Sequence, residues 1–244
     1  VILQGYVGNP VREDTVLTAV SVRKVGNAYI YDLGQNMAGI PRLSNMKGRR
    51  GQTITIRCAE MLYPDTLPDH PVPPYTIDMY RAKKGQMYTE NYKSALSTDH
   101  YIFSGDEKGE DFEPYFTQHG FRYLSIEGLD DSLPLKSVQG IVLESIGKLK
   151  SRYETSDAEV NRLFENIVWG QRSNFLSVPT DCHQRDERLG WTGDAQIFSR
   201  SATYNMNVDA LYTRWLYTLR DDQERRGTYG GFFPNIGFPP TVSS

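Results

Sequence analysis

The first part of the chain alternates short apolar runs with turn residues. From residue 20 to about residue 149, β-branched and aromatic runs are separated by Gly, Pro, Asn and Asp, which is typical of short strands joined by turns. In the segment Thr53–Ala59, apolar Ile54 and Ile56 alternate with polar residues. This alternation predicts a strand with one buried face and one solvent-exposed face. The pattern predicts a jelly-roll-like β-sandwich. The other predicted strands cover residues 28–34, 40–43, 100–103, 112–116, 123–127 and 138–143.

A proline-rich stretch interrupts this pattern. Between Tyr63 and Lys84 the chain carries five prolines, which lack an amide donor and cannot occupy central strands. We therefore expect the stretch to be a loop that leaves the sandwich and returns to it.

The period of the pattern changes at Ser156. Ser156 and Glu159 have the spacing of a capping box, which predicts that a helix begins at Ser156 and runs to about Asn174. Apolar residues then follow at helical spacing and predict one buried face: Val160, Leu163, Phe164, Ile167 and Val168. Two more helices are expected over 191–204 and 207–223. The buried side of the last one would carry Leu211, Trp215, Leu216 and Leu219.

These two patterns divide the chain into two domains. We predict an N-terminal extension over 1–19, a β-sandwich over 20–150 and a helical region over 151–244. Three helices are few for a helical domain, and the last residues predict no terminal helix. The sequence is therefore expected to be a piece of a longer polypeptide.

Composition and charge narrow the classes of function. The 244 residues are 39% hydrophobic and 23% charged with a net charge of −3, the composition of a globular protein. No apolar run is long enough to cross a bilayer, and the absence of a basic stripe argues against a nucleic-acid partner. Cys58 and Cys182 are expected to be free thiols, which favours the bacterial cytoplasm over secretion, the alternative. The four scattered histidines predict no metal site, and no cofactor is expected.

The densest polar cluster follows Pro179. The next fifteen residues hold Trp191, two arginines and four carboxylates: Asp181, Asp186, Glu187 and Asp194. Converging carboxylates suit glycoside hydrolysis, in which one of them must be protonated so that it can donate a proton to the departing sugar oxygen. The alternative is a solvated loop whose carboxylates only pair with Arg185 and Arg188.

The run from Pro179 to Gln196 closely resembles the signature of the bacterial and fungal α-L-rhamnosidases of glycoside hydrolase family 78. It departs from that signature at His183, where proline is expected, but it keeps every carboxylate. Upstream segments resemble the β-sandwich that precedes the catalytic barrel in this family: Tyr31–Gly39, Ala59–Leu62, Tyr88–Asn91, Thr98–Ile102 and Phe112–Tyr123. The implied fold is a β-sandwich followed by the first helices of an (α/α)6 barrel.

The resemblance implies an inverting hydrolysis that releases terminal α-L-rhamnose from a rhamnose-containing glycoside or oligosaccharide. Glu187 matches the family's general acid, and Asp181 and Asp194 match residues that hold the rhamnose hydroxyls. Arg185 would orient the substrate, and Trp191 would form an aromatic wall of the sugar subsite.

The family's general base is a glutamate much farther along the barrel, beyond these 244 residues. An inverting site needs that second carboxylate, so the isolated chain is expected to be inactive. The rival hypothesis is a non-catalytic carbohydrate-binding β-sandwich module with a helical appendage. A homodimer of the full-length protein is an option that the sequence leaves open.

Overall fold

The computed structural model describes residues 5–64, 66, 74–226 and 232–233. The chain separates into two compact units. The sheet unit contains Thr15–Val142 and Gln184–Asp186, and the helical unit contains Val1–Asp14, Leu143–His183 and Glu187–Ser244. Among the described residues, no helix combines the length and the apolar character that crossing a bilayer requires.

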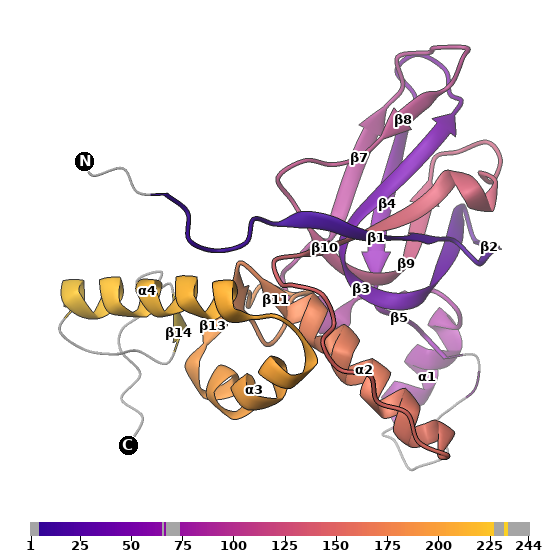
Figure 1. The fold of residues 1–244 in the computed structure, drawn as a ribbon. Helices are drawn as coiled ribbons and strands as arrows, with labels where there is room; N and C mark the ends of the chain where they lie inside the picture. The colour runs from indigo at the N-terminus through magenta and orange to yellow at the C-terminus, as the bar shows by residue number, and fades with distance from the viewer. Residues whose placement is uncertain (1–4, 65, 67–73, 227–231, 234–244) are drawn as a thin grey trace. The chain divides into compact units, whose positions relative to one another are not determined.

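The sheet unit is built on one eight-stranded sheet (Figure 1). Its main path runs β1-β10-β3-β9-β4-β7, with β2 and β8 each pairing with β3. The strands are β1 (Arg12–Thr18), β2 (Ser21–Val25), β3 (Ala28–Met46), β4 (Thr53–Ala59), β7 (Thr98–Ile102), β8 (Glu110–Phe112), β9 (His119–Glu127) and β10 (Val138–Glu144). A smaller ribbon pairs β5 (Met61–Leu62) with β6 (Met87–Tyr88), and the short 3-10 helices are η1 (Glu90–Tyr92) and η2 (Leu135–Ser137). The predicted fold class, a jelly-roll-like β-sandwich followed by the first helices of an (α/α)6 barrel, is confirmed: a strand-rich curled sheet precedes the helices.

Strand β4 has the predicted bounds, and its side chains alternate between the two faces from Thr53 to Cys58. Ile54 and Ile56 are fully buried, and Thr53 and Arg57 are exposed. In contrast, the two strands predicted over 28–34 and 40–43 are one long strand, β3. Its pairing with β9 shifts register between Asp32 and Met37, so the strand continues through an irregularity where the sequence pattern separated two strands.

The proline-rich excursion is more ordered than predicted. Helix α1 spans Pro74–Lys83, so the interpretation of this part as loop was wrong. Proline is tolerated in the first turn of a helix, where its missing amide hydrogen would have no partner, and Pro74 is the first residue of α1. Residues 65 and 67–73 of the predicted loop lie outside the described part of the chain.

The described residues of the helical unit form three helices: α2 (Ala158–Asn174), α3 (Thr192–Asn205) and α4 (Asp209–Arg226). Short ribbons join β11 (Phe175–Leu176) to β12 (Val178–Pro179), and β13 (Gly190–Trp191) to β14 (Phe232–Phe233). A compact apolar core holds this unit together: Ile146, Phe175, Ala202, Met206, Val208 and Leu211.

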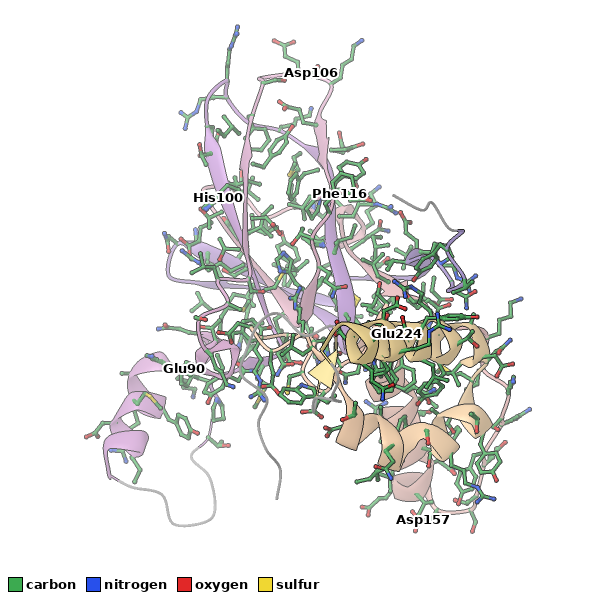
Figure 2. All side chains as sticks on the ribbon, turned by 90° about the vertical axis from the view of Figure 1, so that its left-hand side faces the viewer. Glu90, His100, Asp106, Phe116, Asp157 and Glu224 are labelled. Carbon is green, nitrogen blue, oxygen red and sulfur yellow. The ribbon has the colours of Figure 1, made fainter. Side chains whose placement is uncertain are left out.

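The start of α2 corrects the predicted cap. The helix begins at Ala158, and the carboxylate of Asp157 accepts the amide hydrogens of Glu159 and Val160. Asp157, at the beginning of α2 in Figure 2, is therefore the capping residue instead of Ser156. An aspartate one residue later satisfies the same free amides and carries a charge that the helix dipole favours.

The apolar stripe of α2 is not buried as predicted. Leu163 is 59% exposed, and Val160 and Ile167 are also exposed. On α4, Leu211 and Trp215 are buried as expected, but Leu216 is 59% exposed. The described residues of this unit contain too few helices to cover every apolar face that the periodicity marks.

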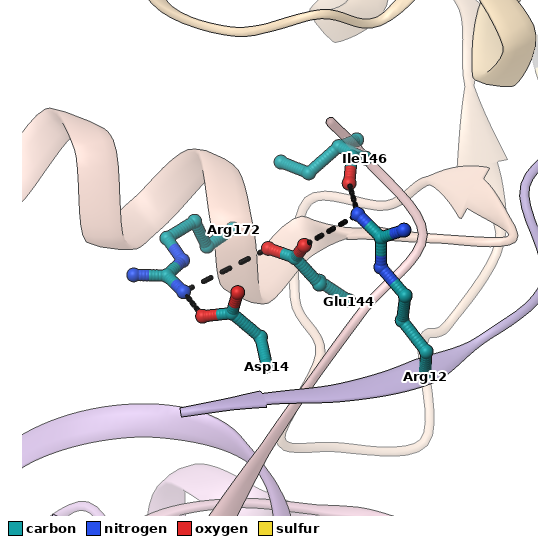
Figure 3. Close-up of polar contacts among 5 residues, drawn as sticks. All are labelled: Arg12, Asp14, Glu144, Ile146 and Arg172. Carbon is teal, nitrogen blue, oxygen red and sulfur yellow. Dashed lines mark hydrogen bonds and ion pairs between the residues drawn. The ribbon is translucent and has the colours of Figure 1, made fainter. Parts of the chain in front are cut away.

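A network of four charged side chains lies within the helical unit (Figure 3). The Glu144 carboxylate accepts from Nη2 of Arg12 at 3.1 Å, and its other oxygen lies 3.7 Å from Nη2 of Arg172. Arg172 also pairs with Asp14, and Arg12 donates to the carbonyl of Ile146 at 3.0 Å. The network joins the N-terminal segment, the end of β10 and α2.

Candidate active site

The polar loop predicted as the site starts from a tight anchor on α2. Strands β11 and β12 form a two-stranded ribbon around Ser177, whose φ of 63° gives the reversal. Thr180 then turns back to the end of α2: its amide donates to the carbonyl of Asn174 at 2.9 Å, and its hydroxyl donates to the same carbonyl at 3.0 Å. These bonds fix the backbone immediately before Asp181.

Asp181 and Glu187 come together in space. The ligand-type atoms of Asp181, Cys182 and Glu187 all lie within 4.8 Å of one another. The thiol of Cys182 donates to Oδ2 of Asp181 at 3.2 Å. Asp181 is exposed and Glu187 is half-buried, so a pair of carboxylates faces the solvent from a backbone that is fixed on one side.

Asp181 also shares a cavity with Asp194. The cavity has a volume of about 380 Å³, within the range of small-molecule sites. Asp194 lies in the first turn of α3, and the residue before that helix is Trp191, which is half-buried. The remaining wall is mostly apolar and comes from α2, α3 and the β11–β12 ribbon, including Ile167, Phe175, Pro179 and Phe198. The cavity therefore offers two carboxylates against an apolar wall.

The middle of the loop belongs to the other unit. Residues Gln184–Asp186 group with the sheet unit. The positive charge of Arg185 partly opposes the rise in pKa that burial gives Glu60. Asp186 accepts a hydrogen bond from the hydroxyl of Ser94. Adjacent acids in the sequence, Asp186 and Glu187, thus have different surroundings.

Asp181, Cys182 and Glu187 are the described side chains whose donor atoms and spacing could hold a metal ion. Two carboxylates and a thiol form an unusual ligand set for a hard cation such as Ca²⁺, which takes six to eight oxygen ligands.

His183, the departure from the family signature, is an internal residue of the loop. Its side chain is buried, with Nδ1 3.4 Å from Oδ1 of Asn174. Burial lowers the pKa of His183 to about 4, and the positive charge of Arg188 acts in the same direction. The imidazole is therefore neutral in the folded protein at neutral pH.

A depressed pKa links His183 to stability in acid. The unfolded chain binds a proton near pH 6.5 and the folded chain only near pH 4, so acidification between these values favours unfolding. Between pH 7 and pH 4, histidine at position 183 should lower the free energy of unfolding by about 3 kcal/mol, and the His183→Gln variant should lack this contribution. Melting curves of the 244-residue chain and the variant at both pH values check this. If acidification lowered the melting temperature of the two proteins equally, the prediction would be wrong.

Sequence reasoning missed the residues that fix the loop. Asn174 was expected only as the end of a helix, yet its carbonyl and side chain hold Thr180. Cys182 was expected only to be a free thiol, which is confirmed, yet it also contacts Asp181. No spacing in the sequence signals such contacts, because they depend on how the loop reverses after Ser177.

Comparison with known proteins identifies similar domains over most of the chain. Residues 23–144 match the bacterial alpha-L-rhamnosidase concanavalin-like domain, and residues 148–244 match the bacterial alpha-L-rhamnosidase 6 hairpin glycosidase domain. An alpha-L-rhamnosidase of Streptomyces avermitilis is 40% identical over 95% of this chain and 20% of its own length. One of Formosa agariphila is 39% identical over 96% of this chain and 23% of its own length.

Solved structures give the same result. The crystal structure of Streptomyces avermitilis alpha-L-rhamnosidase complexed with L-rhamnose superposes with a TM-score of 0.82 at 39% identity, covering 95% of this chain and 21% of that one. The native enzyme of Aspergillus terreus superposes with a TM-score of 0.82 at 34% identity, covering 95% of this chain and 25% of that one. The chain thus spans about a fifth to a quarter of the length of these relatives.

Proposed function

The chain belongs to the bacterial α-L-rhamnosidases of glycoside hydrolase family 78, and on that premise we propose that it carries the acid half of a site that releases terminal α-L-rhamnose with inversion. Glu187 is the proposed general acid. It would donate its proton to the glycosidic oxygen as the bond from that oxygen to the anomeric carbon breaks.

One observation carries this proposal: the Asp181 and Glu187 carboxylates lie within 4.8 Å of each other, and Asp181 lines the cavity that also contains Asp194. A general acid must lie within reach of the glycosidic oxygen of the bound sugar, and Glu187 lies next to a carboxylate of the cavity wall.

The proposed sugar contacts come from two residues that line the cavity, Asp181 and Asp194, and from two that are not part of its lining, Trp191 and Arg185. We propose that Asp181 and Asp194 accept hydrogen bonds from rhamnose hydroxyls, and that Trp191 offers its ring to the C–H face of the sugar. Arg185 would orient the substrate through its fixed set of donors. The apolar wall from α2 and α3 suits the methyl-bearing side of a 6-deoxy sugar.

Inversion requires a second carboxylate about 6.5–9.5 Å from the acid, to activate a water on the opposite face of the ring. In the proposed mechanism a glutamate beyond residue 244 supplies it, as the family resemblance implies. The boundaries at residues 19 and 150 and the homodimer stay predictions. The match of residues 148–244 to a glycosidase domain favours the enzyme over the rival binding module.

We therefore expect the natural polypeptide that carries this sequence to hydrolyse an aryl α-L-rhamnoside and the 244-residue chain alone to be inactive. Proton NMR during the reaction checks the stereochemistry, since an inverting enzyme releases β-L-rhamnose first. Release of the α-anomer would contradict inversion. Turnover by the 244-residue chain would contradict the assignment of the base to a residue outside it.

A further inference from the structure

The last turn of α2 presents two polar side chains to the cavity. Gln171 and Asn174 are three residues apart, so they lie on one face of the helix, and both line the cavity. The side chain of Gln171 is buried and bonded to α3: Nε2 donates to the carbonyl of Ala202 at 3.1 Å, and Oε1 accepts from Nδ2 of Asn205 at 3.0 Å. These bonds join α2 to the helix that carries Asp194 and make the helix pair a fixed base for the loop.

The side chain of Asn174 contacts its own helix with one amide group and the loop with the other. Its Nδ2 donates to the carbonyl of Gly170 at 3.1 Å, which sets the orientation of the amide. Its Oδ1 accepts from the hydroxyl of Thr180 at 3.1 Å and lies 3.4 Å from Nδ1 of the buried His183. Because a carboxamide oxygen only accepts hydrogen bonds, the hydrogen at the second contact belongs to Nδ1. One oxygen atom therefore reaches two loop residues.

Two residues, Asp181 and Cys182, separate Thr180 from His183. The thiol of Cys182 donates to Oδ2 of Asp181 at 3.2 Å, so the carboxylate is tied to the same short segment. Asp181 is exposed, lines the cavity and lies outside any helix or strand. With no regular secondary structure to hold it, its position depends on the contacts of the residues on either side.

We propose that Asn174 is a positioning residue for Asp181: by joining Thr180 to His183, its side chain holds the two residues between them with the Asp181 carboxylate at the cavity. This inference rests on the proposed function, in which Asp181 binds a rhamnose hydroxyl. A loop that is already held in place loses less conformational freedom when the sugar binds. A displacement of about 1 Å in a binding group can cost about 10²-fold in rate, so Asn174 matters without touching the sugar.

The first test compares Asn174→Ala with Asn166→Ala in the natural polypeptide. Asn166 is a matched control, since it is an exposed asparagine on the same helix. We expect Asn174→Ala to lower kcat/KM for an aryl rhamnoside by about 10- to 100-fold, mainly through KM, because Asp181 is proposed to bind the sugar and Glu187 to donate the proton. Asn166→Ala should leave both constants unchanged. Equal losses in the two variants would overturn the inference.

Variants of Thr180 distinguish positioning from a direct contact of Asn174 with the sugar. Thr180→Val removes the hydroxyl that Asn174 accepts and should reproduce part of the loss, whereas Thr180→Ser keeps the hydroxyl and should retain most of the activity. In an Asn174→Ala background, Thr180→Val should have little further effect on kcat/KM. Fully multiplicative effects, as expected if Asn174 contacted the sugar itself, would overturn the inference.

A further readout does not depend on activity. Hydrogen–deuterium exchange of residues 180–183 should become about tenfold faster in Asn174→Ala and stay unchanged in Asn166→Ala. If the wild-type polypeptide hydrolyses no rhamnoside, the proposed function fails, while the exchange rates still decide whether Asn174 holds this segment. Unchanged exchange in Asn174→Ala would overturn the positioning role.

Discussion

Replacing Glu187 with glutamine is expected to reduce hydrolysis of a rhamnoside with a poor leaving group, such as a sugar, by about 10³-fold. The glutamine keeps the size of the side chain but has no acidic proton for the glycosidic oxygen. The loss should be much smaller for an activated aryl leaving group, which departs without being protonated. Rates on the two substrates, measured in the natural polypeptide, check this.

The control for this substitution is Glu165→Gln, an exposed glutamate on α2 in the same unit. It changes the net charge equally and should leave both rates unchanged. Affinity for rhamnose should persist in the Glu187 variant, because the proposed hydroxyl contacts come from Asp181 and Asp194. Equal losses on both substrates would contradict the role of Glu187 as acid.

The second large effect concerns the stability of the helical unit. The side chain of Glu144 is only 5% exposed, and its carboxylate contacts both Arg12 and Arg172 (Figure 3). Glu144→Gln leaves the arginines without that charge, and breaking a buried ion pair from one side is strongly destabilising. We expect the free energy of unfolding to fall by about 3 kcal/mol. This is the lower end of the range for buried ion pairs, because Arg12 is 49% exposed.

Hydrogen exchange of the slowest amides of α2 measures this loss as a fall in the free energy of opening. Glu154→Gln provides the comparison, since its pair with Arg152 is mostly exposed and should contribute well under 1 kcal/mol. Similar exchange in the two variants would show that the network of Figure 3 contributes no more than a surface pair.

The elements that could be predicted are those whose pattern is local. The alternation in β4 determined its bounds, and the helical spacing located α3 and α4 to within a few residues at each end. The cap of α2 was misplaced by one residue because Ser156 and Asp157 are both good caps, and only the backbone decides between them. Helix α1 was missed because prolines dominate its surroundings.

The site could be predicted in its residues but not in its geometry. The resemblance selected Asp181, Glu187 and Asp194, and the structure brings Asp181 near each of the other two. The resemblance could not indicate that residues 184–186, which include Arg185, would group with the sheet unit. Such a grouping depends on how a loop without regular secondary structure folds, and no periodicity records that.

The most direct test of the central claim is a crystal structure of the natural polypeptide carrying Glu187→Gln, with an intact α-L-rhamnoside bound. The account predicts that the side-chain amide at position 187 lies about 2.6–3.2 Å from the glycosidic oxygen, with the sugar hydroxyls on Asp181 and Asp194. A structure in which position 187 faces bulk solvent and another acid contacts that oxygen would contradict it.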